Sequence, residues 1–276
     1  MRNEIVKYHN DLNTVPMRNW TKEEMDFFFA ILSKMKNKGT EEVNFDKKML
    51  VELINYNRKE INRFYRVFEN LGHKVSQIYY FEKSSHTMRF MPLFNEFRVD
   101  WSEDYSDVSL TVSASPNFEY ILNKFDAEFT QYELAEFTLI RSTYAKTMYR
   151  LLKQWRTIGR REFNMDNFRQ LLDIPKSYGV SDIDKRVISP IKKELPDFFK
   201  NLNVEKVKAR TRGTPIIAYV FTWKPEKTGQ WVENKYQNYN RRSELLNQDD
   251  KQIKTSKSLS NDAKEKVKET LERIRK

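Results

Sequence analysis

The stretch FRQLLDIPKSYGVSDIDKRVISPIKKEL, residues 168–195, decides the fold of this chain. It predicts a short helix that stops at Pro175 and a longer helix that begins after Gly179. Proline cannot continue a helix, and glycine permits the turn between the two. The stretch is therefore either a helix-turn-helix whose second helix enters a DNA groove or an ordinary pair of amphipathic helices with a solvated face.

The second helix has two distinct faces. Apolar residues recur every three or four positions and predict an inward face of Val180, Ile183, Val187, Ile191 and Leu195. The polar positions predict an outward face of Asp182, Lys185, Arg186, Ser189, Lys192 and Lys193. Pro190 falls inside this helix, so we expect a lost backbone hydrogen bond and a kink there. Residues 180–189 would then be the part available for contact with bases.

The next segment, NVEKVKARTR at 203–212, predicts a strand with its cations on one face. Alternate side chains of a strand point the same way, and the alternate positions here are Lys206, Lys208, Arg210 and Arg212. The following strand has Ile217, Tyr219, Phe221 and Trp223 at the same spacing, which predicts a core face. The cationic face favours contact with phosphates, whereas the alternative is an exposed edge strand protected by lysines.

The same order of elements is predicted twice. After a loose lead-in at 1–19, Thr21 and Glu24 form a capping box that starts a helix. A strand at 41–45, a helix capped by Asp46, a helix at 57–75 and a hairpin at 77–94 follow. The second set is a helix at 140–159, a strand at 161–165, a helix capped by Asp166, the helix after Gly179 and the hairpin at 203–223. Helix, strand, helix, helix, hairpin is the order of a winged helix.

The predicted fold is therefore α+β, with two tandem winged-helix domains in a pseudo-twofold relation. We place the domains at 1–125 and 126–230, followed by a flexible basic tail at 231–276 that ends in a marginal helix. The formal net charge of +11 is distributed unevenly. The first domain has 18 basic and 18 acidic residues, the second has 20 and 13, and the tail has 12 and 8. This excess in the second domain favours a polyanionic partner.

Several other classes of protein find no support. The chain has no cysteine and only six glycines, and it contains no phosphate-binding glycine loop. His9, His73 and His86 are too scattered to form a metal-binding pair. No run is apolar enough for a membrane span, and the first residues do not resemble a signal peptide. We therefore expect a cytoplasmic protein without cofactor, metal or catalytic activity. A nuclease or nicking enzyme is the weakest alternative.

The first domain carries a second set of candidate DNA-contacting residues. They lie on the outer side of the predicted helix at 57–75 and comprise Arg58, Lys59, Asn62, Arg63 and Arg66. Because this half of the chain is electrically neutral, DNA contact and a solvated helix face are equally good interpretations of them.

Three segments resemble a known family: IRSTYAKTMYRLLKQWRTIG at 140–159, REFNMDNFRQLLDIP at 161–175 and DIDKRVISPIKKEL at 182–195. Their spaced patterns resemble the Rep_3 family of theta-type plasmid replication initiators, over roughly residues 15–225. The resemblance implies two winged-helix domains that bind directly repeated origin sites, called iterons, as monomers. It also implies dimers that repress their own gene at an inverted repeat, and recruitment of the host initiator and helicase.

By this resemblance, the helix at 180–195 is the principal DNA-contacting element. The helix at 57–72 and its hairpin provide a second contact and the dimer interface. The tail is not part of the family pattern. A plasmid or phage transcription regulator on the same fold remains the main alternative, because both kinds of protein bind DNA through winged helices.

Overall fold

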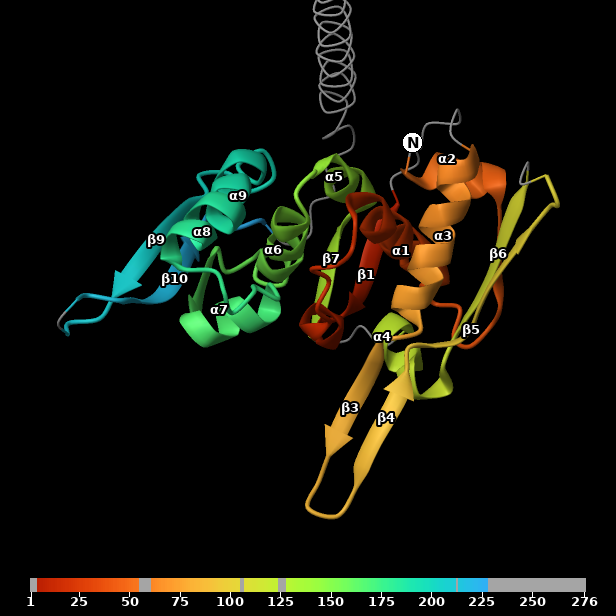
Figure 1. Ribbon diagram of the computed structural model, residues 1–276, viewed down its shortest axis with the longest axis horizontal. Coiled ribbons are helices and arrows are strands. Elements are labelled where there is room, and N and C mark those ends of the chain that lie inside the picture. The colour runs from red at the N-terminus through yellow and green to blue at the C-terminus, as the bar shows by residue number, and fades with distance from the viewer. Residues whose placement is uncertain (1–3, 55–60, 105–106, 124–127, 212, 228–276) are drawn as a thin grey trace, which may run out of the picture. The chain divides into compact units, whose positions relative to one another are not determined.

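A computed structural model describes residues 4–54, 61–104, 107–123, 128–211 and 213–227. Among these residues, no helix is both long and apolar enough to cross a membrane. The predicted tail at 231–276 lies outside the described residues. Described residues up to Glu226 form one compact unit, and the winged-helix order occurs in it twice (Figure 1).

The first winged helix is built from three helices and a three-stranded sheet. Its elements are α1 (Lys22–Met35), β2 (Val43–Asp46), α2 (Lys47–Ile54), α3 (Ile61–Val75), β5 (Phe94–Trp101) and β6 (Val108–Ala114). The sheet has the order β2-β6-β5, and both pairings are antiparallel. The predicted capping box of Thr21 and Glu24 is present at the start of α1. Asp46 begins α2 by accepting a hydrogen bond from the Met49 N–H at 2.7 Å.

The hairpin at 79–92 is not the wing of this domain. Its strands, β3 (Tyr79–Lys83) and β4 (Met88–Pro92), pair only with each other. The wing position belongs to β5 and β6, because β6 pairs with β2 just as the last strand of the second domain pairs with its first. The hairpin was predicted from the sequence, but β5 was not, because its mixed charged and aromatic residues hide the alternation expected of a strand.

The second winged helix repeats the arrangement, again with a three-stranded sheet. Its elements are α6 (Thr143–Lys153), β8 (Arg160–Asn164), α7 (Met165–Leu171), α8 (Val180–Ile183), the π-helical turn η3 (Asp184–Ile188), α9 (Ser189–Glu194), β9 (Asn203–Lys208) and β10 (Ile216–Thr222). The sheet order is β8-β10-β9. The cap of α7 is Asn164, whose side chain accepts from the Asn167 N–H, rather than the predicted Asp166.

The predicted loose lead-in at 1–19 was wrong for its described part. Strand β1 (Ile5–His9) pairs with β7 (Phe129–Glu133), and the 3₁₀ helix η1 (Asn10–Thr14) follows it. Val6, Tyr8 and Leu12 are buried. The segment has few apolar residues, and its strand forms only because a partner 120 residues away in the chain supplies the hydrogen bonds.

Three short helices complete the unit: η2 (Pro116–Phe118), α4 (Glu119–Asn123) and α5 (Leu134–Leu139). The predicted domain boundary at residue 125 falls just before β7, the strand that pairs with β1 of the first half. The division of the chain at 125 and 230 stays a prediction.

Candidate nucleic-acid interface

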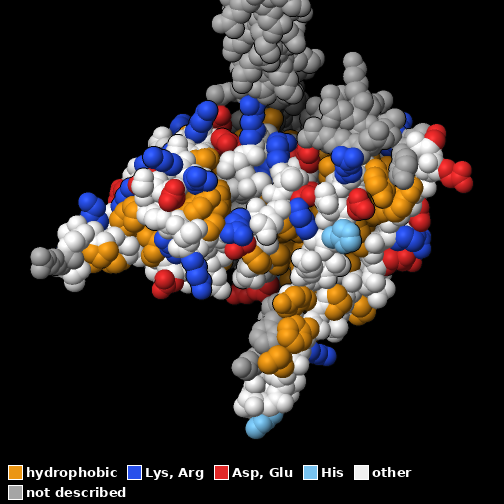
Figure 2. Space-filling model, viewed as in Figure 1, with side chains coloured by type: hydrophobic (Ala, Val, Ile, Leu, Met, Phe, Trp, Pro, Cys, Tyr) orange, Lys and Arg blue, Asp and Glu red, His pale blue; other side chains and the backbone are white. Residues whose placement is uncertain are grey.

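The outward face of the second-domain helix is exposed as predicted. We call α8, η3 and α9 together, residues 180–194, the basic helix. Ile183, Val187, Ile191 and Leu195 are buried against the core, and the half-buried or exposed residues are Asp182, Lys185, Arg186, Ser189, Lys192 and Lys193. Figure 2 shows Lys and Arg side chains gathered over this part of the surface. The one wrong assignment is Val180, which is 44% exposed.

The basic helix accommodates Pro190 by a π-helical turn. The Ser189 N–H donates to the Asp184 carbonyl, five residues back, instead of four. A proline at position 190 has no N–H to give, and its ring would collide with the carbonyl four residues earlier in a regular α-helix. The wider turn relieves that collision. The helical elements α8, η3 and α9 therefore follow one another through Pro190.

The wing of the second domain, β9 with β10, differs from its prediction in two respects. Strand β9 ends at Lys208, so Arg210 lies beyond it, and Arg212 is outside the described residues. Lys206 does not extend freely into solvent, because its Nζ lies 2.5 Å from a carboxylate oxygen of Asp184. The four cations are therefore not one unbroken row on a strand face.

The core face predicted for β10 holds for three of its four residues. Tyr219, Phe221 and Trp223 are buried, but Ile217 is 46% exposed. Burial raises the pKa of Tyr219 to about 12, and the nearby Asp184 carboxylate adds to the rise. Asp184, which belongs to the basic helix, thus faces the wing, and both Lys206 and Tyr219 lie near its carboxylate.

Part of the basic run between Glu136 and Glu162 is internal. Of its seven cations, Lys146, Arg150 and Lys153 lie on one face of α6 and are all buried. Their spacing of four and three residues places them on one side of a helix. Part of the positive charge assigned to the second domain therefore meets internal anions and dipoles and is not available to a polyanion.

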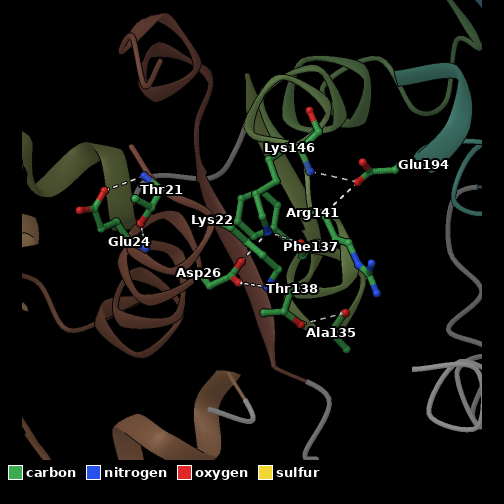
Figure 3. A network of polar contacts seen from close by, with 11 residues as sticks. Thr21, Lys22, Glu24, Asp26, Ala135, Phe137, Thr138, Arg141, Lys146 and Glu194 are labelled. Carbon is green, nitrogen blue, oxygen red and sulfur yellow. Dashed lines mark hydrogen bonds and ion pairs between the residues drawn. The ribbon is translucent and has the colours of Figure 1, made fainter. Parts of the chain in front are cut away.

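Lys146 joins α6 to α1 and α5 (Figure 3). Its Nζ donates to Asp26 and to the Phe137 carbonyl, each at 2.5 Å. Lys22 binds the other carboxylate oxygen of Asp26 at 2.6 Å. Burial lowers the pKa of Lys146 to about 7, against the opposing attraction of Asp26.

Arg150 connects α6 to the N-terminal segment. Its guanidinium donates to the Tyr8 hydroxyl at 3.0 Å, to the Leu12 carbonyl at 2.8 Å and to the Met17 sulfur at 3.1 Å. It also lies over the ring of Phe29, 4.5 Å from the centroid. This one side chain therefore holds β1, η1 and the loop after them against α6.

Lys153 lies at the C-terminal end of the same face of α6. It pairs with Glu136 of α5 at 3.1 Å and with Glu226 at 2.6 Å. Burial alone would lower the pKa of Lys153, but the two carboxylates outweigh it and the pKa is raised. Sequence reasoning missed these roles, because a run of cations without nearby acids in the chain gives no sign that its partners come from distant segments.

The first-domain candidates are only partly described. Helix α3 buries Phe64, Phe68 and Leu71, and Arg66 is exposed on its other side. Asn62 and Arg63 belong to α3, but the placement of their side chains is not described. Arg58 and Lys59 lie outside the described residues.

Comparisons with known proteins agree with this fold. Residues 5–153 match the family model "Initiator Replication protein, WH1", and residues 164–223 match "Initiator Rep protein, WH2". A "Probable replication protein rep" from Bifidobacterium longum is 31% identical over 230 residues, which cover 82% of this chain and 74% of that protein.

A solved structure has the same fold at low sequence identity. It is the Pi initiator protein, whose structure was solved in complex with iteron DNA. The match has a TM-score of 0.60 at 12% identity and covers 82% of this chain and 99% of the other. The two family models together with the Bifidobacterium relative show that this chain belongs to the plasmid-type replication initiator family with two winged-helix domains.

Proposed function

We propose that this protein initiates plasmid replication by binding directly repeated duplex sites at the origin. The basic helix would enter the major groove, and the wing would follow the phosphate backbone beside it. The observation that carries the proposal is the geometry of the basic helix: one face is buried, and the opposite face exposes cations next to a wing. The related Pi initiator, which has this fold, was solved in complex with iteron DNA.

The two elements would make different kinds of contact. Lys185 and Arg186 lie toward the start of the basic helix, where Arg186 could bind a guanine through two parallel hydrogen bonds. Lys208 and Arg210 are exposed on and after β9, where they could neutralise phosphates without regard to sequence. Lys206 would contribute less, because it already pairs with Asp184.

The first domain would provide a second DNA contact and the surface for self-association. Exposed apolar side chains on the β3–β4 hairpin support the latter: Tyr79 is 55%, Met88 57% and Phe90 58% exposed. Figure 2 shows apolar side chains along the projecting hairpin. A dimer formed there would bind an inverted repeat and repress the protein's own gene, while monomers bind the direct repeats.

The proposed role needs no catalytic group, metal or cofactor of its own. The protein would act in the bacterial cytoplasm, where the duplex bound by its two winged helices becomes the platform for the host initiator and the replicative helicase. Incubation of supercoiled origin plasmid with the protein and Mg²⁺ should therefore leave the DNA uncut. Nicking under these conditions would show an enzyme instead.

Footprinting on the DNA that flanks the gene is the direct test of this function. We expect several protected direct repeats on the same face of the duplex. A single protected inverted repeat would show a transcription regulator, and equal protection of scrambled DNA would show that the protein binds without sequence specificity.

Two variants test the division of labour within the second domain. Arg186→Ala should cost about 1–3 kcal/mol on the cognate duplex and relax discrimination at one base pair. Lys208→Ala should weaken binding to all duplexes and reduce the salt slope by about one unit. The same behaviour from both variants would mean that the basic helix lies along the backbone and not in the groove.

A further inference from the structure

A single guanidinium bridges two carbonyls of the turn before the basic helix. Arg169 of α7 donates from one terminal nitrogen to the Tyr178 carbonyl at 2.8 Å and from the other to the Pro175 carbonyl at 3.3 Å. The Tyr178 N–H also donates to the Pro175 carbonyl, at 3.0 Å. Arg169 therefore fixes the backbone of Tyr178, three residues after Pro175.

The ring of Tyr178 faces Arg186 of the basic helix. The central carbon of the guanidinium lies 5.3 Å from the ring centroid, and one terminal nitrogen lies 3.4 Å from the tyrosine hydroxyl. On a third side, Nε of Arg186 is 3.7 Å from a carboxylate oxygen of Asp182. The ring, the hydroxyl and the carboxylate thus hold an arginine whose side chain is still 63% exposed.

Such bracing matters for an arginine that recognises a base. A free arginine side chain has about 2 kcal/mol of rotamer entropy, part of which is lost when its fork is fixed against the two acceptors of a guanine. An arginine already restrained against an aromatic face loses less on binding. The contacts seen here are individually weak, so they restrict the guanidinium without withdrawing it from the surface.

We propose that Tyr178 is a positioning residue for base recognition by Arg186, and that Arg169 acts one step further back by fixing Tyr178. The proposal rests on the function proposed above, in which the basic helix enters the major groove. It adds that sequence discrimination at one base pair depends on residues of α7 and of the turn, which need not touch DNA themselves.

The experiment compares single variants on a set of duplexes. The probe is the site protected in footprinting, together with duplexes altered at each base pair in turn. Arg186→Ala first identifies the base pair whose discrimination it relaxes. Tyr178→Leu, which removes the ring, should reduce discrimination about tenfold at that same base pair, which corresponds to about 1.4 kcal/mol, and leave the salt slope unchanged. Tyr178→Phe, which keeps the ring, should retain most of the discrimination.

Two further variants separate positioning from general stability. The double variant Tyr178→Leu with Arg186→Ala should discriminate no worse than Arg186→Ala alone, because the ring acts only through the arginine. Arg169→Lys keeps the charge but cannot bridge two carbonyls in the same way, so it should lose discrimination at the same base pair. If Tyr178→Leu fails to fold, Arg169→Lys still tests the positioning role.

The outcomes distinguish this inference from the function on which it rests. If Arg186→Ala discriminates like the parent at every base pair, the assignment of Arg186 fails and the bracing role fails with it. If Arg186→Ala relaxes discrimination but neither Tyr178→Leu nor Arg169→Lys does, only the bracing role is overturned. Additive losses in the double variant, or an equal loss on all duplexes, would give Tyr178 a merely structural role.

Discussion

The Glu194 carboxylate accepts hydrogen bonds from the backbone N–H groups of Arg141, at 2.6 Å, and Ser142, at 3.1 Å. The end of the basic helix is thereby fastened to the start of α6. The N-terminus of a helix carries partial positive charge and unpaired N–H groups, and both favour a carboxylate. One turn further along α6, Lys146 reaches Asp26 of α1 (Figure 3). Polar contacts therefore run from the proposed DNA-contacting element to the first domain.

Replacing Glu194 with alanine should lower the free energy of unfolding by about 1–2 kcal/mol. The change removes a charge-assisted cap and leaves two N–H groups at the start of α6 without this partner. Urea unfolding followed by circular dichroism measures it. The matched control is Lys193→Ala. Lys193 is exposed one position before Glu194 in the same helix, so its replacement should change the free energy of unfolding by less than about 0.5 kcal/mol. Equal effects from the two variants would contradict the capping role.

The buried Lys146 should make stability depend on pH. Its pKa is about 7 in the folded protein, against an ordinary value of 10.5. Between these values the unfolded chain binds more protons at this site, so the contribution of Lys146 to stability rises with pH and is lost as the pH falls toward 7. From pH 7.5 to 9, the parent should gain up to about 1.4 kcal/mol per pH unit relative to Lys146→Met.

The check is urea unfolding of the parent and the variant at several pH values. Lys38→Met, at an exposed lysine, controls for the loss of one positive charge and should follow the parent. If Lys146→Met has the same pH dependence as the parent, then Asp26 keeps Lys146 protonated throughout and the lowered pKa is wrong.

Arg150→Met should be among the most damaging single changes in the chain. It removes three hydrogen bonds at once and leaves the buried Leu12 carbonyl and Tyr8 hydroxyl without that donor. We expect a loss of about 3 kcal/mol in the free energy of unfolding. The control is Arg160→Met, because Arg160 is largely exposed and pairs with Glu162 at the surface, where such a pair contributes about 0–1 kcal/mol. A loss below 1 kcal/mol for Arg150→Met would mean that water readily replaces it.

Asp184→Asn should strengthen DNA binding without altering its specificity. The change removes a negative charge beside the wing and releases Lys206 from its ion pair. Affinity for cognate and scrambled duplexes should rise together, and the slope of log K against log salt should steepen by up to about 0.9, the value for one more phosphate neutralised. Fluorescence titrations at several salt concentrations measure both. A gain confined to the cognate duplex would instead place Asp184 at a base.

Local pattern was sufficient to predict the winged-helix order, and the structure confirms it. Helices α1 and α2 begin at Thr21 and Asp46, whose side chains accept hydrogen bonds from N–H groups three residues later in the chain. Glu24 completes the capping box by accepting a hydrogen bond from the Thr21 N–H. Pro175 and Gly179 lie between α7 and the basic helix, because proline cannot continue a helix and glycine permits a turn. The inward positions Ile183, Val187 and Ile191 follow directly from the period of the helix. Each of these predictions needed only residues within one or two turns.

Two of the larger errors share one cause, which is a strand partner far away in the chain. The prediction of a loose lead-in at 1–19 was wrong because β1 forms a strand only by pairing with β7. The hairpin at 79–92 was given the wing position because no local feature shows that β6 will pair with β2. The alternation predicted for β10 also fails: Ala218 to Phe221 are all buried, and Ile217 lies at an irregularity in the pairing with β9 and is exposed.

Near-neighbour interactions therefore allowed prediction of the main helices of both winged helices, the caps at Thr21 and Asp46, and the basic outward face at 182–193. Whether a given charge is buried or exposed depends on the tertiary structure. Lys146, Arg150 and Lys153 carry the same charge as Lys185, Arg186 and Lys193 and lie in an equally basic stretch. Yet the first three are buried among Asp26, Tyr8 and Glu136, while the last three remain at the surface. A cation is stable in a core only where a distant segment supplies an anion or a carbonyl, and that supply depends on the packing of the whole chain.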